Sequence, residues 1–89
     1  MLNSLLVEFV GTFVFLAVIL ATGEAIPIAL ALATVIYMGG KTSGGHFNPA
    51  VSTMFLLKGD IDMLKYAGYI AAQVLGGVAA LQFNNNVLA

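Results

Sequence analysis

The residues best suited to chemistry gather in one polar stretch, residues 43–52, which reads Ser-Gly-Gly-His-Phe-Asn-Pro-Ala-Val-Ser. Asn48 is a favoured helix N-cap, because its side-chain oxygen can accept a hydrogen bond from the N–H of Ala50 or Val51. Pro49 then takes the first helical position, where its missing N–H costs nothing. The stretch therefore predicts a helix start, and the Asn48 amide either only caps that helix or also donates hydrogen bonds to a passing molecule.

The helix that begins there is predicted to be short. Its apolar run, residues 51–57, ends at Lys58, which leaves about ten residues and roughly 15 Å of helix. That is half of the hydrocarbon core of a bilayer, which is about 30 Å thick. Gly44 and Gly45 allow the preceding loop conformations that are closed to other residues. Such a segment is expected to enter the membrane and turn back, lining a cavity or lying buried in protein.

The composition places the chain in a lipid bilayer. Its 89 residues are 61% hydrophobic and 8% charged, which leaves too few polar groups to cover a water-soluble domain. The net charge is −1 and the three basic residues are scattered lysines, so we expect no nucleic-acid partner. The chain has no cysteine, and no catalytic set or phosphate loop is suggested by spacing. We expect no enzyme activity, no cofactor and no metal.

Three longer apolar stretches surround the short helix. We predict an all-α integral membrane protein with three transmembrane helices and one re-entrant half-helix, forming a single domain over residues 1–89. No second copy of this pattern occurs within the chain. The helices are expected at about 4–23, 25–40 and 63–83, with the re-entrant loop and half-helix at 43–58 and the polar residues 84–86 ending the last helix.

Polar side chains on the predicted helices need partners. Glu8 shares a helix face with Gly11 and Thr12, and a carboxylate inside an apolar helix is costly unless it is partnered. Glu8 could be a proton or ion site, or it could accept hydrogen bonds from N–H groups of the loop. His46 has no second ligand type near it, which leaves a loop-fixing hydrogen bond or a pH-sensitive gate. Gln73 is expected to be another loop anchor rather than a solute contact.

The last predicted helix carries two further patterns. Small residues recur every four positions, which permits close helix packing in lipid, within the chain or between chains; they are Gly68, Ala72, Gly76 and Ala80. Tyr66 and Tyr69 lie near its start, where amphipathic rings suit the membrane interface.

The lysines predict the orientation. An odd number of spans puts the two termini on opposite sides, and Lys41, Lys58 and Lys65 all fall on the side of the N-terminus. By the positive-inside rule, the N-terminus is expected to be cytoplasmic.

Three motifs resemble the aquaporin and glycerol-facilitator channels, the major intrinsic proteins. Residues 43–52 resemble the first Asn-Pro-Ala loop of that family. Residues 8–13, Glu-Phe-Val-Gly-Thr-Phe, resemble its first-helix pattern, and residues 69–76 resemble its third helix. The resemblance covers essentially the whole chain, with the motifs in the order and at the spacing of the family.

The resemblance implies a passive channel for water, small neutral solutes or both. Family members contain two such repeats, inverted relative to each other, whose half-helices meet at the middle of the bilayer. One repeat cannot enclose that pore. The chain is therefore expected to pair with an inverted copy of itself, as a homodimer or within a larger homo-oligomer, or with a separately encoded second repeat. Otherwise it is a truncated structural or regulatory piece that does not conduct.

The resemblance also implies roles for individual residues. It favours a loop-anchoring role for Glu8, the role that is also expected of Gln73. The pore-lining and selectivity positions that it implies are Gly44, Gly45, His46, Asn48, Pro49, Ala50, Val51, Ile28 and Ile36. Val51 stands where the family usually has an Arg after its second Asn-Pro-Ala, and this chain has no Arg. A pore built from two copies would then have apolar, wider constrictions, which admits glycerol, urea or dissolved gases as well as water.

Overall fold

The computed structural model describes residues 1–88. Within them, three helices are long and apolar enough to cross a membrane, and no strand occurs. The predicted all-α membrane fold is therefore confirmed. The elements are α1 (Leu2–Thr22), α2 (Ala25–Ser43), α3 (Pro49–Lys58), α4 (Met63–Phe83) and a terminal π-helix, η1 (Asn84–Leu88).

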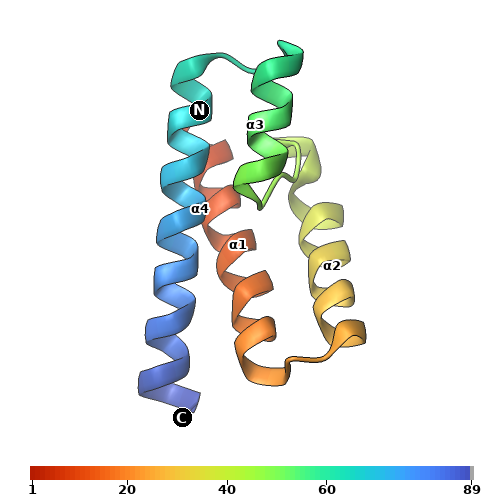
Figure 1. Ribbon diagram of the computed structural model, residues 1–89, viewed down its shortest axis with the longest axis vertical. Helices are drawn as coiled ribbons and strands as arrows, with labels where there is room; N and C mark the ends of the chain where they lie inside the picture. Colours follow the sequence, from red (N-terminus) through yellow and green to blue (C-terminus); the bar gives the residue numbers. More distant parts are fainter. Residues whose placement is uncertain (89) are drawn as a thin grey trace.

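The three long helices run side by side along the 40 Å axis of the molecule (Figure 1). Helix α1 packs against both α2 and α4, and α3 packs against α4. Helix α3 begins part-way along that axis and runs to the end of the molecule where α4 starts (Figure 1). The described chain therefore begins and ends at opposite ends of the bundle, as three spans require.

Glycine conformation, more than glycine position, decides where the helices end. Gly23 adopts the left-handed region, with φ 62°, and closes α1. Helix α2 continues to Ser43, beyond the predicted end near residue 40, because Gly44 and not Gly40 takes that conformation. The N–H of Gly44 donates to the carbonyl of Gly40 over 2.7 Å.

The end of α4 also differs from the sequence prediction. Asn84 keeps right-handed helical dihedral angles, so the asparagines end the α-helix without ending helical structure. The described chain continues from there as η1.

The small residues of α4 pack against α1 within the chain. A Cβ atom on Gly76 would lie 2.8 Å from the carbonyl oxygen of Phe9, and one on Gly68 would lie 2.8 Å from Leu5 Cδ2. Ala80, one turn after Gly76 on α4, is fully buried. Without larger side chains, the two helix backbones approach closely, which is how helices associate in lipid.

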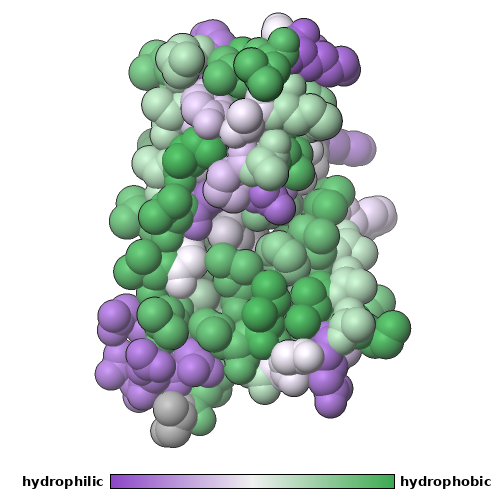
Figure 2. All heavy atoms as spheres, in the orientation of Figure 1, coloured by the Kyte–Doolittle hydropathy of each residue, from purple (hydrophilic) through white to green (hydrophobic). Residues whose placement is uncertain are grey.

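Large apolar side chains cover much of the outside of the molecule, and several polar side chains are buried inside it. Figure 2 shows apolar side chains over most of one face, with hydrophilic groups at the two ends and a smaller group where α3 begins. Many large apolar residues of the described chain are exposed, which suits contact with lipid or with another chain. The buried polar residues are Glu8, Thr12, Ser43, His46, Ser52 and Gln73.

Candidate functional site

Asn48 caps the start of α3, and its amide nitrogen makes no hydrogen bond within residues 1–88. Its backbone is extended and its Oδ1 accepts from the N–H of Ala50 over 2.7 Å, while Pro49 occupies the first helical position. Because Oδ1 is the acceptor in the cap, the Nδ2 group is the part of the amide left to donate. Asn48, Pro49 and Ala50 are all exposed. The tip of the half-helix therefore presents hydrogen-bond donors on the surface of the single chain.

Glu8 lies fully buried beneath the loop and accepts hydrogen bonds from three chain segments. Its Oε2 accepts from Ser43 Oγ (2.7 Å) and the His46 N–H (3.1 Å). Its Oε1 accepts from the Phe47 N–H (2.8 Å) and Gln73 Nε2 (2.9 Å). A carboxylate offers about four lone-pair sites, so these bonds use its capacity. The loop amides thereby compensate a charge that lipid would penalise.

The His46 side chain is enclosed on several sides. Its Nδ1 lies 2.7 Å from Ser52 Oγ. The ring stacks on Phe55 at 4.8 Å and meets the edge of Tyr69 at 4.9 Å. Gln73 Nε2 donates to the same Ser52 hydroxyl over 2.9 Å. The His46 side chain is thus a buried member of a side-chain network and is not presented on the surface of the single chain.

Tyr69 lies in the interior of the molecule. The sequence analysis predicted that its ring lies at the membrane interface, and for Tyr69 this prediction is wrong. The side chain is fully buried, and its hydroxyl donates to the carbonyl of Ser43 at the end of α2. The loop folds back over this face of α4 and covers the ring. Tyr66, one turn earlier, is half-buried, and its hydroxyl lies 2.9 Å from Thr53 Oγ1 on α3.

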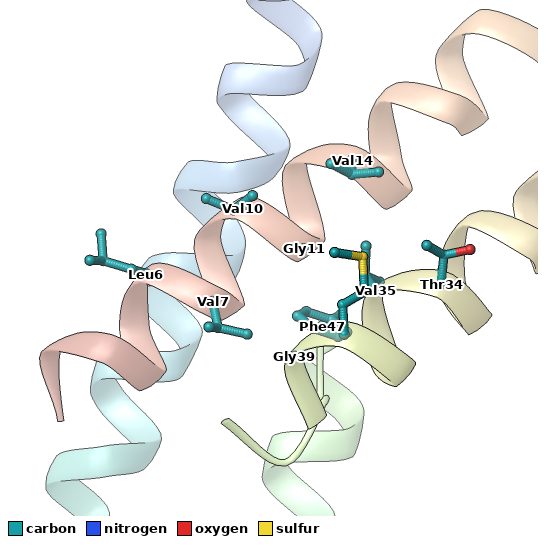
Figure 3. A pocket seen from close by; sticks show the side chains of 10 residues that line it. Leu6, Val7, Val10, Gly11, Val14, Thr34, Val35, Gly39 and Phe47 are labelled. Atoms are coloured by element: carbon teal, nitrogen blue, oxygen red, sulfur yellow. The ribbon is translucent and has the colours of Figure 1, made fainter. Parts of the chain in front are cut away.

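Phe47 is a site residue that the sequence reasoning missed. It is the one non-glycine residue among those described with a positive φ, 52°. Its ring is buried between α1 and α2 (Figure 3). A Cβ on Gly11 would overlap the ring. The available signal was Gly11 one turn after Glu8, which leaves room for a large loop side chain beside the anchored carboxylate.

The predicted constriction residues are only partly brought together. Gly45, with φ 67°, lies against Ile36, since a Cβ there would be 3.4 Å from Ile36 Cγ2. Ile36 is 42% exposed. Ile28 is half-buried two turns earlier on α2, and Val51 is half-buried in the first turn of α3. Gly44 is exposed. In the single chain these positions do not surround a closed channel.

Two cavities flank the loop. The larger, about 460 Å³, is an apolar groove between α1 and α2, where Val7, Val10 and Val14 lie opposite Val35 (Figure 3). The smaller, about 290 Å³, lies between α1 and α4 at the tip of α3. The Phe47 ring borders both cavities.

Comparison with known proteins agrees with this architecture. The family model for the major intrinsic protein matches residues 22–88. The chain is 43% identical over 88 residues to the glycerol uptake facilitator protein-like 6 of Lactiplantibacillus plantarum, covering 89% of this chain and 41% of that protein. It is 39% identical over 95 residues to aquaporin Z of Brucella melitensis, covering 90% of this chain and 42% of that protein.

A more distant relative is the lens fiber major intrinsic protein of Gallus gallus, 33% identical over 89 residues, with 86% of this chain and 34% of that protein covered. The chain thus spans about two fifths or less of the length of these curated relatives. The match extends through α2, the Asn-Pro-Ala loop, α3 and α4. The chain belongs to the major intrinsic protein family.

Proposed function

We propose that this chain is one half-repeat of a passive transmembrane channel for water, small neutral solutes or both, and not an enzyme. The observation that carries the proposal is the Asn48 cap, which leaves amide donors exposed at the tip of a re-entrant half-helix. The names of the relatives, a glycerol uptake facilitator-like protein and an aquaporin, support the same class.

The half-helix supplies both charge and hydrogen bonds to the proposed path. Its N-terminus carries about half a positive charge from the helix dipole, and two such ends facing a narrow pore would repel cations and hydronium. Asn48 would donate to each passing water or hydroxyl group, which orients it and interrupts a chain of proton transfer. The carbonyls of Gly44, Gly45 and His46 would supply acceptors along one wall, opposite an apolar wall. Solutes would then pass without tight binding.

Two half-repeats are needed to enclose this path. Two half-helices of about 15 Å each, placed end to end, cover a hydrocarbon core of about 30 Å. We propose an inverted pair of copies, alone or within a larger homo-oligomer, with the N-terminus of the predominant orientation cytoplasmic. A separately encoded second repeat is the alternative partner. In the remaining alternative the chain is a non-conducting structural or regulatory piece.

Individual residues take two kinds of role in this proposal. Glu8 and Gln73 hold the loop through the hydrogen bonds described above. Ile28, Ile36 and Val51, with Gly45, would form apolar constrictions. Without an arginine there, glycerol, urea or dissolved gases can accompany water.

The first test is osmotic shrinkage of liposomes that contain only the 89-residue chain. Asn48→Asp keeps an oxygen for the cap but replaces the amide donors with a negative charge. We expect water flow above that of empty liposomes and a clear reduction in the variant. Asn85→Asp, which makes the same change at an exposed position on η1, should leave the flow unchanged. No excess flow in vesicles where the chain is shown to be inserted would refute a self-sufficient channel.

A further inference from the structure

The Phe47 ring is a wall that the two cavities share. Among residues 1–88, Phe47 alone lines both the groove between α1 and α2, of about 460 Å³, and the cavity between α1 and α4, of about 290 Å³. The residue is 2% exposed, so its ring fills the space in which it lies. Removal of the ring would therefore leave the two cavities with no side chain between them at this point.

Two glycines leave the room that the ring occupies. Gly11 on α1 and Gly39 on α2 both lie beside the ring (Figure 3). A Cβ atom on Gly11 would overlap the ring, and one on Gly39 would lie 3.6 Å from its Cζ atom. Because neither glycine has a side chain, α1 and α2 leave an opening at this level, and a side chain from the loop closes it.

The backbone of Phe47 is held for this task. Its φ of 52° is uncommon for a residue with a side chain, and such conformations persist only where the surrounding structure determines them. The N–H of Phe47 donates to Glu8 Oε1 over 2.8 Å. The buried carboxylate thus fixes the loop while the glycines receive the ring.

The spaces on the two sides of the ring differ in chemistry. The groove is apolar and lies beside residues open to lipid, since Val10 is 53% and Met38 is 78% exposed. The smaller cavity contains the tip of α3 and the polar residues Thr12 and Gln73, each 2% exposed. Phe47 separates a surface that faces lipid from the polar interior of the site.

We infer that the Phe47 ring is a barrier that closes a side opening between α1 and α2. It keeps apolar molecules of the bilayer, such as lipid chains and dissolved apolar solutes, away from the tip of α3. The barrier itself follows from the two cavities. Its consequence for transport rests on the proposed function, in which Phe47 becomes a specificity-determining residue that restricts entry to the two ends of the path.

Molecular oxygen tests the barrier, because it is small, apolar and paramagnetic, dissolves in lipid and speeds the relaxation of methyl groups that it reaches. The 89-residue chain, methyl-labelled and placed in phosphatidylcholine nanodiscs, offers three reporters. Thr12 lies on the inner side of the ring, Val14 lines the groove, and Ala80 is fully buried elsewhere. We expect oxygen to relax Val14 at least about fivefold more than Thr12, because a close-packed wall excludes it.

Phe47→Ala removes the ring and keeps a Cβ atom. We expect oxygen to relax Thr12 to within about twofold of Val14 in this variant, because small apolar molecules enter apolar cavities, while Ala80 stays protected. Phe55→Ala is the matched control. It removes a ring that stacks on His46 at 4.8 Å but lines neither cavity, so Thr12 should remain protected.

A second substitution closes the opening from the other side. A side chain at Gly11 points into the space of the ring, so Gly11→Leu added to Phe47→Ala should restore at least about half of the protection of Thr12, as volume-conserving exchanges do. A leucine on α1 would not repair a loop that had merely loosened. Circular dichroism of each variant checks that the helices remain intact.

Three results would overturn the barrier. They are a Thr12 methyl group that stays protected in Phe47→Ala, one that relaxes equally in Phe55→Ala, and one that Gly11→Leu fails to protect again. Osmotic flow tests the proposed function separately. Liposomes without flow refute the self-sufficient channel and leave the barrier standing, whereas a parent chain in which Thr12 relaxes like Val14 overturns the barrier even if water flows.

Discussion

At the scale of single residues, the site depends on the Glu8 carboxylate. It accepts the hydrogen bonds that the N–H groups of the loop would otherwise have to make with water. Glu8 joins α1, the end of α2, the loop and α4 through hydrogen bonds of 2.7–3.1 Å. A buried charge with this many donors is better viewed as a fixed component of the loop than as an exchangeable ion site. The role is strongly directional, because every partner donates.

Glu8→Gln tests this directionality. The amide nitrogen of glutamine would replace one acceptor oxygen and oppose an N–H or O–H donor, which leaves at least one buried donor unpaired. We expect the variant to lose roughly 1–3 kcal/mol of stability, with faster hydrogen exchange at the amides of His46 and Phe47. Glu24→Gln, at an exposed position, should show neither effect. Unchanged exchange at the two loop amides would contradict the role given to Glu8.

At the scale of elements, the contact between α1 and α4 requires glycine at one position and tolerates alanine at the next. A Cβ on Gly76 meets the backbone oxygen of Phe9 at 2.8 Å, whereas one on Gly77 meets only Leu16 Cδ1, at 3.1 Å. A side-chain tip can move, but the backbone of a packed helix cannot move without separating the helices.

Gly76→Ala is therefore expected to destabilise the protein by about 1–3 kcal/mol, as overpacking does. Gly77→Ala should be neutral or stabilising, by up to about 1 kcal/mol, because alanine favours helix over glycine. Thermal unfolding in detergent, followed by circular dichroism, measures both. Equal effects of the two substitutions would mean that close backbone approach does not hold α4 on α1.

The sequence predicted the helices more accurately than the contacts between them. Hydrophobic runs and the Asn-Pro pair are local signals, and they sufficed for three spans and a half-helix. The predicted end of α2 is too early because the glycines at 39, 40, 44 and 45 look alike in the sequence, and only the structure shows that Gly44 and Gly45 are the two with a positive φ. Tyr69 was assigned to the interface because its burial depends on the loop folding back over α4, a contact between residues distant in sequence.

The roles of two further residues near the site could not be predicted from local sequence patterns. The sequence places Thr12 on the same helix face as Glu8, yet only the three-dimensional structure shows that its buried hydroxyl has no hydrogen-bond partner among residues 1–88. Phe47 could not be assigned from its apolar character, because its position depends on a strained backbone and on the space above Gly11. Such features arise from packing and are absent from any single stretch of sequence.

At the scale of the whole molecule, an inverted pair of copies requires that some chains insert in each direction. Lys41 lies in the last turn of α2, Lys58 is the last residue of α3, and Lys65 lies in the first turn of α4. These ends of the helices lie toward the same end of the bundle as the N-terminus (Figure 1), and positive residues favour the cytoplasmic side. Three lysines give only a modest bias, so the opposite orientation remains accessible.

We therefore expect most chains to insert with the N-terminus inside and a measurable minority with it outside. An impermeant maleimide applied to intact cells should label a minority of Asn3→Cys chains. Asn85→Cys, near the other end, should give the complementary majority. If Asn3→Cys is never labelled until the cells are opened, copies do not pair in inverted orientation, and a separate second repeat must supply the other half of the pore.

The anchoring of the loop to Glu8 has a geometric consequence. A trans peptide is a rigid plane whose N–H and C=O bonds point in opposite directions, and the described chain contains no cis peptide. The amides of His46 and Phe47 point toward the carboxylate, so the carbonyl oxygens of Gly45 and His46, on the far sides of the same planes, must point away from it. The buried Glu8 carboxylate thus fixes the orientation of two successive peptide planes, and under the proposed function it would thereby direct the carbonyl oxygens of Gly45 and His46 toward the solute without contacting the solute itself.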